Sequence, residues 1–107
     1  MAGRHTRALV MLALGLCIAL RPLAPGVGEV KRLYVRPAFR GRGLGRRLVE
    51  RIIAEARSRG CRVLRLDTLP EMSAARRLYA SFGWRPCGAY THNPIPGAIF
   101  LELALEA

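Results

Sequence analysis

Strand-like alternation of apolar and polar residues appears in several short stretches of this chain. Residues 29–35 and 62–68 alternate in this way and are rich in branched and aromatic side chains, which predicts two β-strands. Pro37 ends the first of them, because proline cannot donate a hydrogen bond within a sheet. Residues 84–89 and 98–105 predict two further strands near the carboxyl end.

Two stretches between the strands instead carry apolar residues at helical spacing. Over residues 44–56 the apolar positions recur every three or four residues, with charged residues on the opposite face, and Gly60 stands where a helix commonly ends. Residues 72–82 repeat the pattern and are closed by Gly83. Two amphipathic helices are therefore expected.

The order of these elements predicts an α/β fold with a mixed sheet. A strand, helix and strand in sequence form a crossover, which places residues 62–68 parallel to residues 29–35. Thr68 and Glu71 have the spacing of a capping box at the start of the second helix. Residues 90–97 form a turn-rich loop between the last two strands and can border a substrate site.

A loop rich in arginine and glycine joins the first of these strands to the first helix. Gly41, Gly43 and Gly45 lack a Cβ atom, so the backbone can take positive φ values and a ligand can approach its N–H groups. The first N–H groups of the helix have no intrahelical acceptor, the helix dipole favours negative charge there, and flanking arginines supply forked donors. This loop therefore predicts a site for a polyphosphate, although it has neither a P-loop ending nor a dinucleotide fingerprint.

The net charge and the cysteines of the chain say less about its function than this loop does. The 107 residues carry a net charge of +11, spread along the whole chain, which suits nucleic acid, acidic membranes and a polyanionic cofactor alike. Three cysteines without paired spacing and two histidines at opposite ends predict neither a metal site nor a disulfide framework. Free thiols in a reducing cytoplasm are the expected state.

Two motifs resemble those of the GNAT family of acetyl-CoA-dependent N-acetyltransferases. Residues 40–45, Arg-Gly-Arg-Gly-Leu-Gly, match its Arg/Gln-x-x-Gly-x-Gly/Ala signature, and residues 75–84 match its Ala-x-x-Leu-Tyr-x-x-x-Gly-Phe segment. The resemblance covers residues 15–107, which are expected to form one acetyltransferase domain. It implies a GNAT-like mixed sheet with helices packed on it, in the order β-β-α-β-α-β-β, with the family's amino-terminal elements missing.

The same resemblance implies a binding site for acetyl-CoA. Leu33, Tyr34 and Val35 match the strand whose backbone pairs with the pantetheine arm and offers an N–H group to the thioester carbonyl. Tyr79 matches the tyrosine commonly assigned as general acid to the leaving thiolate, and Met72 stands where many members carry an asparagine that contacts the cofactor. The pyrophosphate is expected on Arg40, Gly41, Arg42, Gly43, Leu44, Gly45 and Arg46.

Two carboxylates are candidates for the base that deprotonates the acceptor amine. Asp67 matches a glutamate of the members that acetylate the amino termini of ribosomal proteins, and Glu29 matches the base of histone-type members. Each can instead be an ion-pair partner of nearby arginines. The base is therefore left open between Asp67, Glu29 and water.

The amino-terminal residues 1–14 match no part of the family. Basic residues followed by an apolar run resemble a secretory signal, but the run is too short to span a membrane and the proline-rich residues 22–25 make a poor cleavage site. The other interpretation is a divergent leader that packs as a short helix.

Residues 15–21 resemble the family strand that forms a hairpin, through residues 22–28, with the cofactor-binding strand. The outer edge of that strand is normally covered by earlier parts of the family fold. We therefore expect an unpaired sheet edge beside residues 15–21, and self-association through it.

The sequence thus predicts transfer of an acetyl group from acetyl-CoA to a primary amine of an unidentified small molecule or protein. The first alternative is a CoA-binding GNAT fragment with little or no transferase activity. The second is a basic nucleic-acid-binding protein, which would need aromatic platforms that the scattered Tyr34, Phe39 and Tyr90 do not provide. Neither a metal, a membrane nor a specific nucleic acid is expected as a partner.

Overall fold

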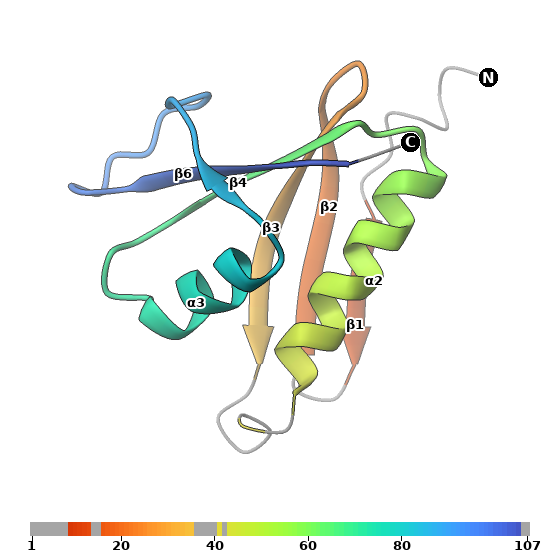
Figure 1. Ribbon diagram of the computed structural model, residues 1–107, viewed down its shortest axis with the longest axis horizontal. Helices are drawn as coiled ribbons and strands as arrows, with labels where there is room; N and C mark the ends of the chain where they lie inside the picture. Colours follow the sequence, from red (N-terminus) through yellow and green to blue (C-terminus); the bar gives the residue numbers. More distant parts are fainter. Residues whose placement is uncertain (1–8, 14–15, 36–40, 42, 106–107) are drawn as a thin grey trace.

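The computed structural model describes residues 9–13, 16–35, 41 and 43–105, which form one mixed sheet with helices α2 (Leu44–Ser58) and α3 (Ser73–Ser81) on the same face (Figure 1). The strands lie in the order β1-β2-β3-β4-β6-β5. Their bounds are β1 Leu9–Ala13, β2 Leu16–Ala24, β3 Val27–Val35, β4 Val63–Thr68, β5 Arg85–Pro86 and β6 Ile99–Ala104.

Strands β3 and β4 are parallel, which confirms the predicted crossover through α2, but they pair over a short distance. Residues 27–29 pair with residues 63–65, and the two strands separate beyond that point (Figure 1). Strand β3 continues beside β2 as far as Val35, whereas β4 follows β6 along its whole length. Because adjacent strands of a twisted sheet rotate relative to one another, these different partners draw β3 and β4 apart.

The hydrophobic core lies between the two helices and one face of the sheet. Helix α2 contributes its apolar stripe to this core, as the helical spacing predicted, and β4 alternates buried and half-buried positions as expected for a strand covered on one side. Each large aliphatic side chain buried here contributes roughly 1.5–3 kcal/mol. The fully or nearly fully buried members from these elements are Ile18, Leu20, Val30, Val49, Ile52, Ala56, Leu64 and Leu66.

Strand β1 corrects two expectations for the amino-terminal part of the chain. Residues 9–13, expected to lie within a leader that packs as a short helix, form a strand instead. This strand pairs antiparallel with residues 16–20 of β2, so the expectation of an unpaired edge beside residues 15–21 is wrong. A short continuous apolar run has the same periodicity in a buried helix and in a strand, which is why the pattern failed to separate them.

The start of α3 corrects the predicted capping box. Thr68 is the last residue of β4 and pairs with Ile99, so its backbone belongs to the sheet and not to the helix. The helix begins after Met72, which makes no side-chain capping bond. Its end is as predicted, because Gly83 follows it with a φ of 94° and Gly60 follows α2 with a φ of 82°.

Two further boundaries differ from the sequence pattern. The hairpin between β2 and β3 turns at residues 25–26, so it is tighter than the expected connection over residues 22–28. Strand β5 covers only residues 85–86, not 84–89, although the N–H group of Cys87 still donates to the carbonyl of Phe100 at 2.8 Å. The described order is therefore β-β-β-α-β-α-β-β, one strand more than predicted.

Gly28 lies within the short parallel contact and provides a test of its packing. A Cβ atom there would lie 2.9 Å from Leu20 Cδ1 and 3.1 Å from Leu64 Cδ2, both in the core. We expect Gly28→Ala to lower the free energy of unfolding by ~1–2 kcal/mol through overpacking. Gly88→Ala is the matched control, because no described atom lies within 4 Å of its added methyl group. Equal urea midpoints for the two variants would contradict this account.

Candidate active site

A small cavity opens where β3 and β4 separate. It measures about 180 Å³, which corresponds to roughly six water molecules at about 30 Å³ each. This space suits the acyl end of a thioester better than a whole cofactor. Its walls come from β3, β4, the residue before α3 and α3 itself, and they consist of Val30, Lys31, Leu66, Asp67, Thr68, Met72 and Tyr79.

Tyr79 brings a phenol to this cavity from α3. It is the buried residue of that helix, with 6% of its surface exposed, and its ring packs 5.6 Å from the ring of Trp84. Burial raises the pKa of Tyr79 to about 12. The hydroxyl therefore keeps its proton at neutral pH and can act as a hydrogen-bond donor.

Met72 and Thr68 also line this cavity. Met72 is 45% exposed, and the buried Thr68 hydroxyl lies 3.7 Å from its sulfur as a weak hydrogen-bond donor. A thioether stands here where the family resemblance implied an amide. The wall is consequently apolar and adaptable at this point.

The amino end of α2 has the geometry of an anion site. Gly41 and Gly43 have φ values of 82° and 73°, and no described atom lies within 4 Å of where a Cβ would stand on either. Gly45, expected to share this freedom, lies within the helix and has no positive φ. No acidic residue occupies the first turn, and no side chain of the described residues caps it, so the dipole at this end suits an anionic ligand.

Among the described residues, the helical ladder of α2 begins after the first three N–H groups of the helix. Its first bond to the capping residue runs from the N–H of Arg47 to the carbonyl of Gly43, so the N–H groups of Leu44, Gly45 and Arg46 precede the ladder. The side chain of Arg46 turns toward α3, where it contacts Ser81 and Phe82. Arg40 and Arg42, both expected to bind pyrophosphate, lie outside the described residues.

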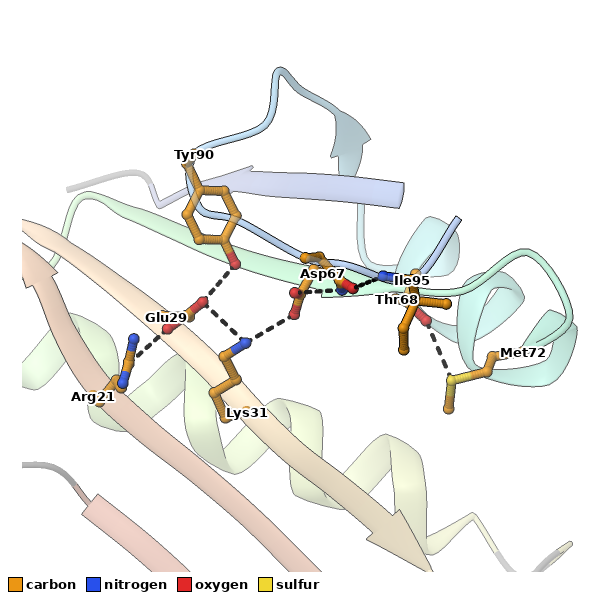
Figure 2. A network of polar contacts seen from close by, with 9 residues as sticks. Arg21, Glu29, Lys31, Asp67, Thr68, Met72, Tyr90 and Ile95 are labelled. Carbon is orange, nitrogen blue, oxygen red and sulfur yellow. Dashed lines mark hydrogen bonds and ion pairs between the residues drawn. The ribbon is translucent and has the colours of Figure 1, made fainter. Parts of the chain in front are cut away.

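The sheet face away from the helices carries a polar network centred on Glu29 (Figure 2). Glu29 is completely buried and accepts hydrogen bonds from Arg21 Nε at 2.7 Å and from the Tyr90 hydroxyl at 2.8 Å. Lys31 Nζ lies 3.3 Å from the same carboxylate. Two cations and a hydroxyl thus compensate a charge that would otherwise be costly to bury.

Lys31 links this network to the cavity. Its Nζ donates to Asp67 Oδ1 at 3.0 Å, and Asn93 Nδ2 donates to Asp67 Oδ2 at 3.0 Å. The Lys31–Asp67 pair joins β3 to β4 beyond the end of their backbone pairing. Figure 2 shows the chain of contacts running from Arg21 through Glu29 and Lys31 to Asp67.

The network shifts the protonation of its members. Burial alone would raise the pKa of Asp67, but the hydrogen bonds from Lys31 and Asn93 and the charge of Lys31 outweigh it, so this pKa lies below its ordinary value. Burial alone would lower the pKa of Lys31, yet its bond to Asp67 and the charges of Glu29 and Asp67 raise it. Burial and the bond to Glu29 raise the pKa of Tyr90. Lys31 and Asp67 are therefore both ionised at neutral pH.

The structure brings some of the expected site residues together and separates others. Asp67 and Tyr79 line one cavity, whereas Glu29 does not line it and reaches it only through Lys31. Glu29 and Asp67 both form ion pairs, as the ion-pair interpretation of these carboxylates predicted. Glu29 pairs with an arginine and with Lys31, whereas Asp67 pairs with Lys31.

Sequence reasoning missed Lys31 and Asn93. Lys31 follows Glu29 by two residues, so both side chains lie on the same face of the strand. The strand periodicity alone could therefore have identified Lys31 as a neighbour of Glu29. Asn93 lies in the loop of residues 90–97, whose path over the sheet no periodic pattern indicates. That loop contacts the polar network through the bonds of Tyr90 to Glu29 and of Asn93 to Asp67.

Comparison with known proteins shows which protein family the chain resembles. A sequence model described as "Acetyltransferase (GNAT) family" matches residues 12–84. The chain belongs to the GNAT acetyltransferase family. Over 95 residues it is 46% identical to an uncharacterised N-acetyltransferase of Schizosaccharomyces pombe, covering 88% of this chain and 58% of that protein.

Solved structures agree on the GNAT fold. A Klebsiella pneumoniae protein described as an acyl-CoA N-acyltransferase superposes with a TM-score of 0.78 at 37% identity, covering 85% of this chain and 63% of that one. A Salmonella typhimurium acetyltransferase, solved with its cofactor acetyl-CoA, superposes with a TM-score of 0.72 at 26% identity, covering 89% and 60%. This GNAT chain thus spans about three fifths of the length of these relatives.

Three further observations bear on the expected partners and thiols. None of the described helices is both long and apolar enough to cross a membrane. Within the part of the chain that the structure describes, no group of three or more His, Cys, Asp or Glu side chains can hold a metal ion. Cys17, Cys61 and Cys87 are free thiols of intermediate exposure.

The lowered pKa of Asp67 predicts how stability depends on pH. A carboxyl group with a folded-state pKa below its unfolded value stabilises the fold above about pH 3.8, and this stabilisation is lost as pH falls through the folded-state value. We expect urea unfolding of the wild type to lose stability in this acidic range, and Asp67→Asn to lose less between about pH 5 and pH 3. Parallel curves for both proteins would contradict the pairing of Asp67 with Lys31.

Proposed function

We propose that this chain is an N-acetyltransferase that moves an acetyl group from acetyl-CoA to a primary amine. The observation that carries the proposal is the opening between β3 and β4, which follows the last parallel pair at residues 29 and 65 and leaves a cavity beside the middle of β3 and the carboxyl end of β4. The amino end of α2 lies at the same end of the sheet (Figure 1). We therefore propose that one acetyl-CoA molecule extends from the amino end of α2 to this cavity, and the acetyl-CoA bound in the Salmonella relative supports the choice of donor.

The fit of acetyl-CoA follows from the chemistry of the two ends. At the helix end, the N–H groups of Leu44, Gly45 and Arg46 and the open backbone at Gly41 and Gly43 suit a pyrophosphate. Between the ends, β3 extends past its last parallel pair through residues 33–35, where strand backbone can pair with the amides of the pantetheine arm. The resemblance to the family assigns the same stretches, and Arg40 and Arg42 complete its phosphate loop.

Acetyl transfer requires four events in this cavity. The amine loses a proton, its nitrogen forms a bond to the thioester carbon, and the carbon–sulfur bond breaks with its electron pair leaving on sulfur. The leaving thiolate then takes a proton. Tyr79 lies on the cavity wall with its proton retained, so we assign it as the donor to sulfur.

Asp67 is the better placed of the two candidate bases. It lines the cavity, and a carboxylate has about four lone-pair sites, so its bonds to Lys31 and Asn93 leave room for an ammonium donor. Glu29 lies outside the cavity wall and already accepts from three groups. Because the pKa of Asp67 is lowered, it is a weak base, and we expect its contribution at the low end of general-base effects, on the order of 10²-fold.

Calorimetric titration with acetyl-CoA tests the anion site. Gly43→Asp places a carboxylate against the phosphates, and we expect it to weaken acetyl-CoA binding by about tenfold or more, which corresponds to roughly 1.4 kcal/mol. Aspartate is among the residues that tolerate left-handed backbone, so the fold is expected to survive.

Gly60→Asp is the matched control for that titration. Gly60 follows the other end of the same helix with the same open surroundings and a φ of 82°, so the backbone cost is similar while the charge lies far from the proposed phosphates. No binding heat with the wild type, or equal loss of affinity in both variants, would refute the assigned site.

A thiol-release assay over a panel of primary amines, followed by kinetics with the best acceptor, tests the catalytic roles. We expect Tyr79→Phe to lower kcat by roughly tenfold or more while acetyl-CoA affinity changes little, because the lost hydroxyl acts only on the leaving group. Asp67→Asn should lower kcat more than Glu29→Gln does.

Different outcomes of these kinetics lead to different conclusions. Unchanged rates in both carboxylate variants would leave deprotonation to water. Acetyl-CoA binding without thiol release above the uncatalysed rate, for any amine in the panel, would favour the alternative of a binding protein that does not transfer.

A further inference from the structure

We propose that Arg46 is a positioning residue, which ties the first turn of α2 to the last turn of α3 and thereby fixes Tyr79 against the cavity. The inference rests on the proposed function for its catalytic consequence, but the tie itself is a property of the free protein. Arg46 lies in the first turn of α2, directly after the glycine loop, and its side chain contacts another helix that is more than thirty residues away in sequence.

The contact has two parts of different chemistry. Arg46 Nη2 donates a hydrogen bond of 2.8 Å to the Ser81 hydroxyl oxygen, and its guanidinium carbon lies 4.7 Å from the centroid of the Phe82 ring. The planar guanidinium suits both, since it has several donors in its plane and a face that packs on aromatic rings. A lysine can supply the charge but not this planar, two-sided arrangement.

Both partners on α3 are themselves anchored. The Ser81 hydroxyl donates to the carbonyl of Leu78 at 2.6 Å, so its oxygen is oriented to accept from Arg46. Phe82 packs against the hydrophobic core and is the residue at which α3 ends. The arginine therefore holds a fixed point of the helix end and not a freely moving side chain.

Helix α3 packs its apolar side chains on the core, but few side-chain hydrogen bonds of the described residues hold it in place. It has nine residues, Tyr79 is its buried one, and no side chain caps its amino end. Near that end Arg76 Nη1 donates to the carbonyl of Pro70 at 2.9 Å. The tie to Arg46 secures the opposite end, one turn from Tyr79.

Arg46 consequently serves two sites with different atoms. Its N–H group belongs to the three that precede the α2 ladder, where we place the pyrophosphate, while its side chain holds the helix that carries Tyr79. Ordering of the phosphate end is thereby linked to the position of the phenol. This role differs from direct binding of phosphate by the guanidinium, and the two roles predict different kinetics.

Trp84 offers a reporter that requires neither cofactor nor acceptor. It is the sole tryptophan of the chain, it is 5% exposed, and its ring packs 5.6 Å from that of Tyr79. Displacement of α3 changes this packing, so acrylamide quenching and the emission maximum of Trp84 follow the tie directly.

The variants are Arg46→Met and Ser81→Ala, alone and combined, with Arg57→Met as the control. Arg57 lies in the last turn of α2, so its replacement removes the same charge from the same helix. We expect Arg46→Met and Ser81→Ala each to increase Trp84 quenching in the free protein and to lower kcat by roughly three- to tenfold, with KM for acetyl-CoA changed by less than about twofold. Arg57→Met is expected to change neither, and the double variant to show less than the sum of the single effects.

Two results would overturn the proposal. One is unchanged Trp84 quenching in Arg46→Met, which would show that no tie holds α3. The other is a raised KM with unchanged kcat, which would make the guanidinium a phosphate ligand. Absence of acetyl-CoA binding or of transfer by the wild type would overturn the proposed function instead, and the quenching comparison would still decide the tie.

Discussion

The short parallel contact between β3 and β4 is the constraint on which the rest of the structure depends. Three residues of each strand pair, and the strands then follow different partners, β2 on one side and β6 on the other. A longer contact would close the sheet and remove the cavity beside Tyr79. The buried Gly28 allows this contact to be close, since a side chain there would collide with Leu20 and Leu64. The two strands are thus in close contact at residues 27–29 and 63–65, and the cavity lies beyond this contact.

The charged face of the sheet compensates for that opening. Beyond the last backbone pair, Lys31 of β3 and Asp67 of β4 restore a connection through side chains at 3.0 Å. Glu29 and Arg21 extend the connection to β2, and the Tyr90 hydroxyl extends it to the loop above the sheet (Figure 2). A fully buried carboxylate is tolerated because each of its oxygens has a charged partner. The ion pair with Lys31 keeps Asp67 ionised at neutral pH, so its carboxylate can accept a proton. The same ion pair lowers the pKa of Asp67 and so makes it a weaker base.

The features that could be predicted from the sequence are mostly those that depend on neighbouring residues in the chain. The stripe of α2, the alternation of β4 and the glycines after both helices depend on neighbours in the chain, and all three were predicted correctly. The glycine loop was located for the same reason, although Gly45 proved helical. Errors arose where distant partners decide. Strand β1 is defined by its pairing with β2, and Thr68 is held in the sheet by Ile99 rather than released to cap α3. The partners of Glu29 and Asp67 come from a loop and a neighbouring strand, so spacing along the chain contained no record of Asn93.

Amide hydrogen exchange with and without acetyl-CoA tests most directly the claim that the opening between β3 and β4, together with the amino end of α2, forms the acetyl-CoA site. The account predicts added protection in residues 33–35 of β3 and in residues 44–46 at the start of α2, with β5 and β6 unchanged. Protection confined to β6 and the loop of residues 87–98, or equal protection over the whole basic surface, would contradict it.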